Sequence, residues 1–236
     1  MLLFGAQICI NHLNDISKAA EYCSTAVNVC NEEPKRAPYL GRSYHYLGVC
    51  FSALAPRIFS IERKELHAKA LEAFQQAFIS GCNDYLFLFH HALEHAETRN
   101  IVAAKSLVQK SLTLNEDYAP SWILLVLLLT SQKLYSEASD VCRIAMSHHE
   151  DVRLYYCSAK IALYLKRYSK AMTTLSVMCK LFADTNSDTI QETNHPANDM
   201  FFSPRGKQDD LSESRTSISQ MSDTSSLKMP GTFPFH

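Results

Sequence analysis

Three residues in the middle of the chain have the types and the spacing of a metal-dependent catalytic site. His91, Glu94 and His95 match the pattern H-x-x-E-H, which occurs in one group of zinc peptidases. The two histidines are four residues apart, so on a helix both could bind one metal ion, with Glu94 as general base. A structural role is favoured instead, because His91 and His95 fall where the next repeat has Leu125 and Leu129. With no obvious third ligand downstream, we expect partly buried, hydrogen-bonded histidines, no metal and no cofactor.

The rest of the sequence offers little further chemistry. It contains no phosphate-binding glycine loop and no nucleophile elbow. The pair His148 and His149 suits a helix end, where a positive charge is favourable. The eight cysteines include no Cys-x-x-Cys pair and mostly lie in apolar runs, which favours free thiols in a reducing compartment. The net charge of −1 favours neither nucleic-acid binding nor polybasic membrane binding. We therefore predict a protein that is not an enzyme.

The helices that would hold these residues repeat along the chain. Alanines at positions 70, 104 and 138 are evenly spaced, and each precedes an apolar residue four positions later and a small one seven later. Such positions share one face of a helix, where small side chains let a second helix approach closely. The step between these alanines, about 34 residues, is the period of tetratricopeptide repeats. The predicted packing residues are Ala19, Ala26, Tyr44, Leu47, Gly48, Ala70, Phe74, Ala77, Ala104, Trp122, Leu125, Ala138, Ala145 and Ala171.

This period predicts an all-α, tetratricopeptide-type α-solenoid of about five helical hairpins, rather than a helical bundle without repeats. The predicted units cover residues 1–33, 39–82, 84–117, 118–150 and 151–183. The second unit has about ten extra residues around Pro56–Ser60, which we expect to form a loop. Asp and Ser residues at the expected helix starts would cap free backbone N–H groups. The longest apolar run, residues 122–129, is too short to cross a bilayer.

From residue 184 to 236 the sequence becomes rich in Ser, Thr, Asp and Asn and loses its apolar period. Such a composition predicts a disordered tail or linker. Ser203, Thr216 and Ser217 are candidate phosphorylation sites, because they lie in Ser-Pro and Arg-Thr-Ser contexts. Neither end has the polar capping repeat of a complete solenoid, so we expect a fragment of a longer repeat protein.

The inner face of the solenoid can be predicted from the same register. Repeat proteins that bind a chaperone's carboxylate terminus have Lys, Arg and Asn on this face, but here it is mostly apolar. An apolar partner helix would suit such a face if neighbouring repeats leave it open. The predicted positions are Phe4, Ile8, Tyr46, Phe89, His90, Leu93, Ile123 and Leu127.

Three stretches, residues 6–13, 66–77 and 122–135, give the chain a resemblance to the tetratricopeptide repeat protein 7 family. The likeness covers about residues 1–183. It implies a non-catalytic scaffold that holds a phosphatidylinositol 4-kinase catalytic subunit together with a lipid-anchored subunit and a hyccin-type subunit. It also implies a cytoplasmic protein that partners recruit to the inner face of the plasma membrane, supporting phosphatidylinositol phosphate synthesis.

Two other functions stay open at this point. One is a generic tetratricopeptide adaptor for another assembly, in trafficking or in a ubiquitin-ligase machine. The other is an enzyme that uses His91, Glu94 and His95. Protein partners are expected in both scaffold cases, and no nucleic acid in either.

Overall fold

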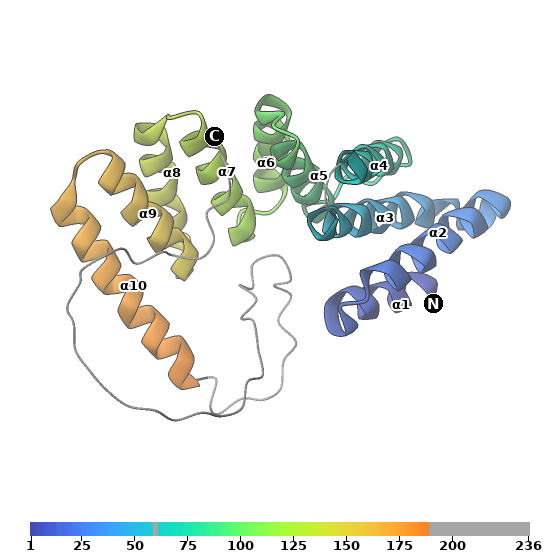
Figure 1. Cartoon of the computed structure of the whole chain (residues 1–236), viewed down its shortest axis with the longest axis horizontal. Coiled ribbons are helices and arrows are strands. Elements are labelled where there is room, and N and C mark those ends of the chain that lie inside the picture. The colour runs from blue at the N-terminus through green and yellow to red at the C-terminus, as the bar shows by residue number, and fades with distance from the viewer. Residues whose placement is uncertain (59–60, 189–236) are drawn as a thin grey trace, which may run out of the picture. The chain divides into compact units, whose positions relative to one another are not determined.

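Ten α-helices and no strand occur in residues 1–58 and 61–188, the part of the chain that the structure describes (Figure 1). The structure is a computed structural model. These residues all belong to one unit, Met1–Asn194. The helices are α1 (Leu2–Ile8), α2 (Ile16–Glu32), α3 (Leu40–Leu54), α4 (Ile61–Ile79), α5 (Tyr85–Glu97), α6 (Ile101–Leu114), α7 (Ala119–Ser131), α8 (Tyr135–His148), α9 (Val152–Tyr164) and α10 (Tyr168–Asp188).

Consecutive helices pair into five hairpins, α1–α2 to α9–α10, and the second helix of each hairpin also packs on the first helix of the next. The predicted all-α solenoid of about five hairpins is therefore confirmed. A π-helical segment, Cys9–Leu13, extends α1, and two 3-10 segments, Pro34–Tyr39 and Ala55–Arg57, flank α3. The helices lie inside the predicted unit ranges except at the end, where α10 continues to Asp188, beyond the expected limit of 183. The rest of the predicted tail lies outside the described residues.

Small side chains lie where the hairpins pack most closely. A Cβ atom added to Gly48 of α3 would lie 2.8 Å from Cε1 of Phe74 in α4, so only glycine fits this crossing. The other predicted packing residues are also in the interior. Ala19, Ala26, Ala70, Phe74, Ala77, Ala104, Leu125, Ala138, Ala145 and Ala171 are buried, and Tyr44, Leu47 and Trp122 are half-buried.

The turns inside the hairpins repeat one backbone geometry. Arg99, Lys133 and Lys166 have left-handed φ angles of 63°, 61° and 58°. The residue after each donates its N–H to a carbonyl five residues back, for example from Leu134 to Leu129 at 3.0 Å, as in a Schellman motif. Asp side chains cap several helices, including Asp15 at α2. The predicted capping by serine is wrong at α8, where no side chain caps the helix.

The extra residues of the second hairpin do not form mainly a loop, so that prediction is corrected. The 3-10 segment Ala55–Arg57 takes up a few of them, and residues 59–60 lie outside the described part. Most of them lengthen α4, which begins nine residues before its packing alanine, Ala70, whereas α6 and α8 begin three residues before theirs. Helix formation satisfies the backbone polar groups internally, which a loop would leave to water. The added turns carry Arg63, and His67, which follows them, stands where α6 begins with Ile101 and α8 with Tyr135.

Candidate functional site

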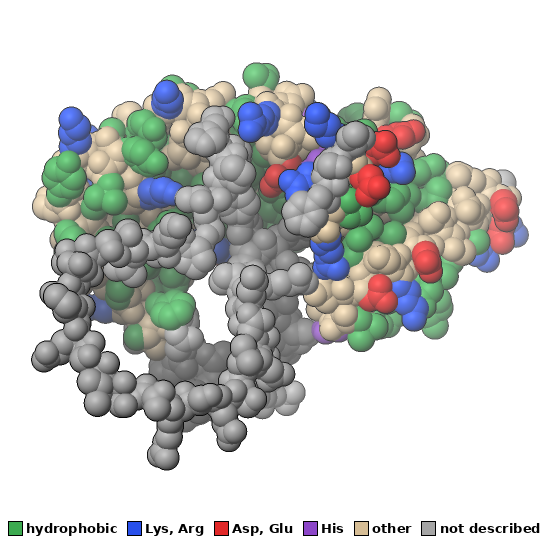
Figure 2. Space-filling view, viewed as in Figure 1, with side chains coloured by type: hydrophobic (Ala, Val, Ile, Leu, Met, Phe, Trp, Pro, Cys, Tyr) green, Lys and Arg blue, Asp and Glu red, His purple; other side chains and the backbone are tan. Residues whose placement is uncertain are grey.

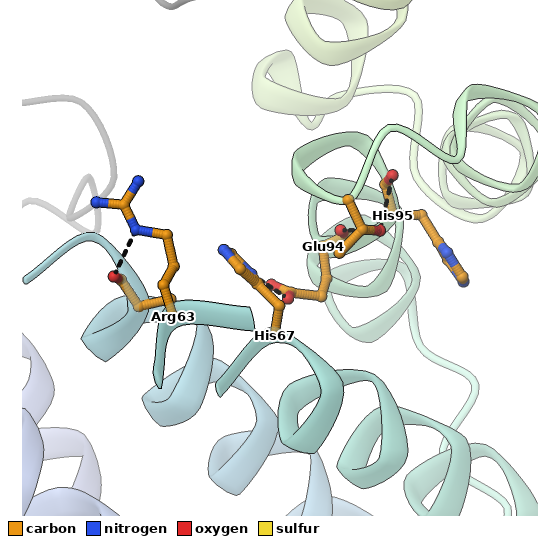
Figure 3. Close-up of polar contacts among 6 residues, drawn as sticks. Arg63, His67, Glu94 and His95 are labelled. Atoms are coloured by element: carbon orange, nitrogen blue, oxygen red, sulfur yellow. Dashed lines mark hydrogen bonds and ion pairs between the residues drawn. The ribbon is translucent and has the colours of Figure 1, made fainter. Parts of the chain in front are cut away.

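The most unusual polar contact in the described residues joins the lengthened α4 to α5 (Figure 3). Glu94 of α5 has 0% of its surface exposed. The Nδ1 atom of His67, which directly follows the added turns of α4, lies 2.7 Å from Oε1 of Glu94. The second carboxyl oxygen, Oε2, is buried and has no hydrogen-bond partner. One contact to one side chain therefore compensates for burying a carboxyl group, which is costly when it is left unpaired.

Arg63 lies one turn before His67 and fixes the start of α4. Its Nε–H donates to the backbone carbonyl oxygen of Ala55 at 3.2 Å, and it also approaches the carbonyl oxygen of Ile58 at 3.3 Å. The guanidinium thus closes the end of the 3-10 segment onto the helix that carries His67. The lengthened helix is in this way held at both its first turn and its contact with α5.

The two histidines of the H-x-x-E-H motif turn to a different side of α5 from Glu94. The rings of His91 and His95 stack with centroids 4.8 Å apart, and His91 also stacks on Phe74 of α4. Burial, with the nearby His95, lowers the pKa of His91 to about 4, and burial also lowers the pKa of His95. Both rings are therefore neutral near pH 7. Their Nδ1 atoms are buried without a partner, so the predicted hydrogen bonding is wrong at these atoms.

The three motif residues do not converge on one point. Glu94 reaches toward His67, while His95 points away from both (Figure 3). No group of three or more His, Cys, Asp or Glu side chains in the described part of the chain is placed to hold a metal ion. The structural role that the sequence suggests for this motif stays a prediction, and its metal chemistry has no geometry to support it here.

A second histidine contact joins α3 to α5 and was not foreseen. Nε2 of His45 lies 2.9 Å from Nδ1 of His90, so one neutral imidazole donates to the other. Burial is the main reason that the pKa of each ring is lowered to about 3. In the repeat register His45 corresponds to Ile123, which is apolar and buried. A histidine at a position that is apolar in another repeat could have indicated a buried polar contact. Glu94 gives the same indication, because it stands where Leu128 lies one repeat later.

The predicted inner row is only partly open. Phe89 is covered edge-on by Tyr118, with centroids 5.2 Å apart, and Ile123 packs with Leu154 of the next hairpin. Phe4 is exposed, at 64% of its surface. Neighbouring hairpins therefore fill the middle of the row. The row comprises Phe89 and Ile123, which are buried, Tyr46, His90, Leu93 and Leu127, which are half-buried, and Phe4 and Ile8, which are exposed.

Two remaining features were singled out in the sequence. His148 ends α8, and Nε2 of His149 lies 3.2 Å from the carbonyl oxygen of Glu116. The candidate phosphorylation sites Ser203, Thr216 and Ser217 lie outside the described residues. Among the helices that are described, none combines the length and the apolar character needed to cross a bilayer.

Comparison with known proteins gives three informative relatives. Tetratricopeptide repeat protein 7B of Mus musculus is 30% identical over 182 residues, which is 76% of this chain and 21% of that protein. Tetratricopeptide repeat protein 7A of Homo sapiens is 27% identical over the same length. The putative cargo-transport protein ypp1 of Schizosaccharomyces pombe is 26% identical over 129 residues, covering 53% of this chain and 15% of ypp1. The chain thus spans about a fifth of the tetratricopeptide repeat 7 proteins. No protein-family model matches it.

Solved structures of tetratricopeptide proteins share the fold. MamA superposes with a TM-score of 0.59 at 14% identity, covering 74% of this chain and 92% of MamA. YrrB, a tetratricopeptide protein with an unusual peptide-binding site, superposes with a TM-score of 0.56 at 14% identity, covering 78% of this chain and 86% of YrrB. These likenesses show the fold. The sequence matches confirm, over three-quarters of its length, the resemblance of this chain to the tetratricopeptide repeat protein 7 family.

Proposed function

We propose that this chain is a non-catalytic scaffold segment that helps to assemble and localise a phosphatidylinositol 4-kinase complex at the plasma membrane. The observation that carries the proposal is the 30% identity to tetratricopeptide repeat protein 7B over 182 residues. The partners are the kinase catalytic subunit, a lipid-anchored subunit and a hyccin-type subunit. The chain reaches the inner face of the membrane through these partners, where the assembly supports phosphatidylinositol phosphate synthesis.

The geometry supports a binding role rather than a chemical one. Five hairpins present long helical faces and repeated turns to a partner, and each hairpin packs against its neighbours. The polar residues that resemble a catalytic motif, Glu94 and His91, are taken up by contacts between helices. The described surface instead displays large apolar side chains singly and in groups, including Tyr156, Tyr164 and Met172. Aromatic residues and Met are enriched in protein interfaces.

A second candidate is an adaptor for another assembly, and one observation favours it. The fission-yeast relative ypp1 bears the description of a putative cargo-transport protein. A trafficking assembly would use the same hairpin surfaces with different partners. The ubiquitin-ligase alternative has no relative in its favour.

Affinity capture distinguishes these functions. The full chain is expressed with a tag in cells beside the variant Ala138→Asp, which places a charge at a position with 0% exposure and disrupts the α7–α8 hairpin. We expect the phosphatidylinositol 4-kinase and its lipid-anchored subunit with the wild-type chain and neither with the variant. Capture of cargo-transport proteins instead would favour the adaptor, and capture of neither set would contradict both assignments.

A further inference from the structure

The fifth hairpin has a charge balance unlike that of the hairpins before it. Residues 152–188 contain six Lys and Arg side chains and two Asp, both at the end of α10, whereas residues 1–151 contain 13 basic and 16 acidic side chains. Arg153 is partly neutralised by Asp151, since its Nη2 atom lies 2.7 Å from Oδ2 of that residue. The remaining five cations outnumber the two aspartates of the hairpin, Asp184 and Asp188. Such a mainly basic segment attracts an acidic partner.

The cations alternate with exposed aromatic rings on α9. Tyr156, Lys160 and Tyr164 follow one another at steps of four residues, so they lie along one face of the helix. Tyr156 and Tyr164 expose 43% and 56% of their surface. The Nζ atom of Lys160 lies 5.9 Å from the centroid of the Tyr156 ring. Over α8 to α10, at the left of the face drawn in Figure 2, the charged side chains seen are basic, and the acidic ones lie farther right.

The repeat register shows what normally covers this face. Tyr156 corresponds to Ile123 of α7, which is 5% exposed because Leu154 of α9 packs beside it. In the four preceding hairpins the second helix likewise packs against the first helix of the hairpin that follows. The open face of α9–α10 is thus continuous with a series of helix-to-helix interfaces, and its geometry suits one more helix. In the same register Lys160 replaces Leu127, which puts a positive charge on this face, so that helix has to present acidic groups.

We propose that the α9–α10 face binds an acidic amphipathic helix of a partner protein. Carboxylates of the helix pair with Lys160, Arg167 and Lys170, and its apolar side chains pack on the exposed tyrosines and Met172. A protein helix fits better than a membrane surface, because the face runs along the hairpin in register with the earlier interfaces. The inference needs a scaffold role, but it does not depend on the kinase complex being the right assembly.

A direct binding assay with the purified full chain tests this face. The probe is a fluorescent helical peptide of Leu, Ala and Glu with Leu on one face, long enough to span α9, and the matched peptide has Lys at every Glu position. The test variant is Lys160→Glu, Arg167→Glu, Lys170→Glu, all at exposed positions. The control variant, Lys64→Glu, Lys69→Glu, Lys110→Glu, makes the same change of charge on α4 and α6, also at exposed positions.

We expect saturable binding of the acidic peptide, weakened at least about tenfold by the test variant and by high salt, and unchanged in the control variant. Circular dichroism of each variant verifies that its helices are retained. Equal binding of both peptides, no saturable binding of the acidic one, or equal losses in the two variants would overturn the proposal. It would also be overturned if vesicles of phosphatidylserine and phosphatidylcholine, mixed three to seven, bound the chain through these three residues while the acidic peptide did not. None of these results bears on the kinase assignment, which the capture experiment tests separately.

Discussion

Replacing His67 by alanine tests whether one contact holds the lengthened α4 against α5. The substitution removes the partner of a carboxyl group that has no exposed surface and whose other oxygen already lacks a partner. Leaving one member of a buried polar pair unpaired costs about 3–5 kcal/mol. The side chain of His67 is 17% exposed, so its removal admits some water to Glu94. We therefore expect a loss of about 3 kcal/mol of unfolding free energy, at the lower end of that range.

Replacing the other member of the pair, Glu94, should cost much less unfolding free energy. Glu94→Leu places at this position the residue found at Leu128 in the next repeat, where it is 3% exposed. Replacing a buried polar residue by an apolar one of similar volume is often close to neutral. His67 keeps its access to water, so we expect a change below about 1 kcal/mol. The double variant His67→Ala, Glu94→Leu should then be about 2 kcal/mol more stable than His67→Ala alone. With the cost of Glu94→Leu included, the coupling energy is about 2–3 kcal/mol, within the range for residues in direct contact.

The assay is urea unfolding of the full chain at pH 7.5, followed by circular dichroism. Because repeat proteins can unfold in segments, hydrogen exchange of peptides from α4 and α5 gives a second, local measurement. A cost below about 1 kcal/mol for His67→Ala would refute the reasoning. So would a double variant that is no more stable than His67→Ala, since the cost would then not come from the stranded carboxyl group.

Three further changes have defined outcomes. Gly48→Ala puts a methyl group 2.8 Å from the buried Phe74 ring and should cost about 1–3 kcal/mol in thermal unfolding, whereas Gly5→Ala, with its nearest neighbour 3.6 Å away, should not destabilise the chain. Burial lowers the pKa of His45 to about 3, so as the pH falls below 6.5 the unfolded chain binds a proton that the folded one does not. The contribution of this ring to the free energy of unfolding is therefore full above pH 7 and should be about 2 kcal/mol smaller at pH 5, as unfolding titrations can measure. His45→Phe should remove this part of the pH dependence. Lys133→Gly relieves a φ of 61° and should stabilise the chain by about 0.5 kcal/mol, and a loss of stability would contradict the turn assignment.

The fold could be predicted from the sequence because its main determinant is periodic. Alanines spaced one repeat length apart, at Ala70, Ala104 and Ala138, repeat the same close helix crossing, and all three have no exposed surface in the structure. Local signals of this kind do not depend on knowing the partner helix. The insertion was harder, because extra residues between two periodic segments fit a loop and a longer helix equally well. The structure distinguishes the two, because α4 already begins at Ile61.

The polar contacts between helices could be predicted only in part. The repeat register places Glu94 and His45 at positions where other hairpins have buried aliphatic residues, so their burial was readable from the sequence. Their partners were not. His67 stands where α6 begins with Ile101 and α8 with Tyr135, so the repeat register does not indicate a partner for a carboxyl group there. The hydrogen bond between His45 of α3 and His90 of α5 could be foreseen only by knowing how two first helices face each other. The repeat register predicts which residues are buried, but which buried residues bond to each other across helices is known only from the structure.

Two of the buried polar residues of the stack, His45 and Glu94, lie where the second and third hairpins meet. Glu94 bonds to α4 through His67, and α5 bonds to α3 through His90 and His45. The third and fourth hairpins meet at the apolar cluster around Leu125 and Leu128 and at one hydrogen bond between hydroxyl groups, Ser111 to Ser121 at 2.9 Å. Apolar packing is not directional, but hydrogen bonds fix distance and angle. The relative position of α3, α4 and α5 is thus specified by two bonds at defined points, in addition to the packing of Phe74 against Gly48. Buried polar pairs add little net free energy to folding but constrain how the helices meet. Replacing both partners of each bond by apolar residues should therefore change the stability of the protein less than it changes the geometry of this junction.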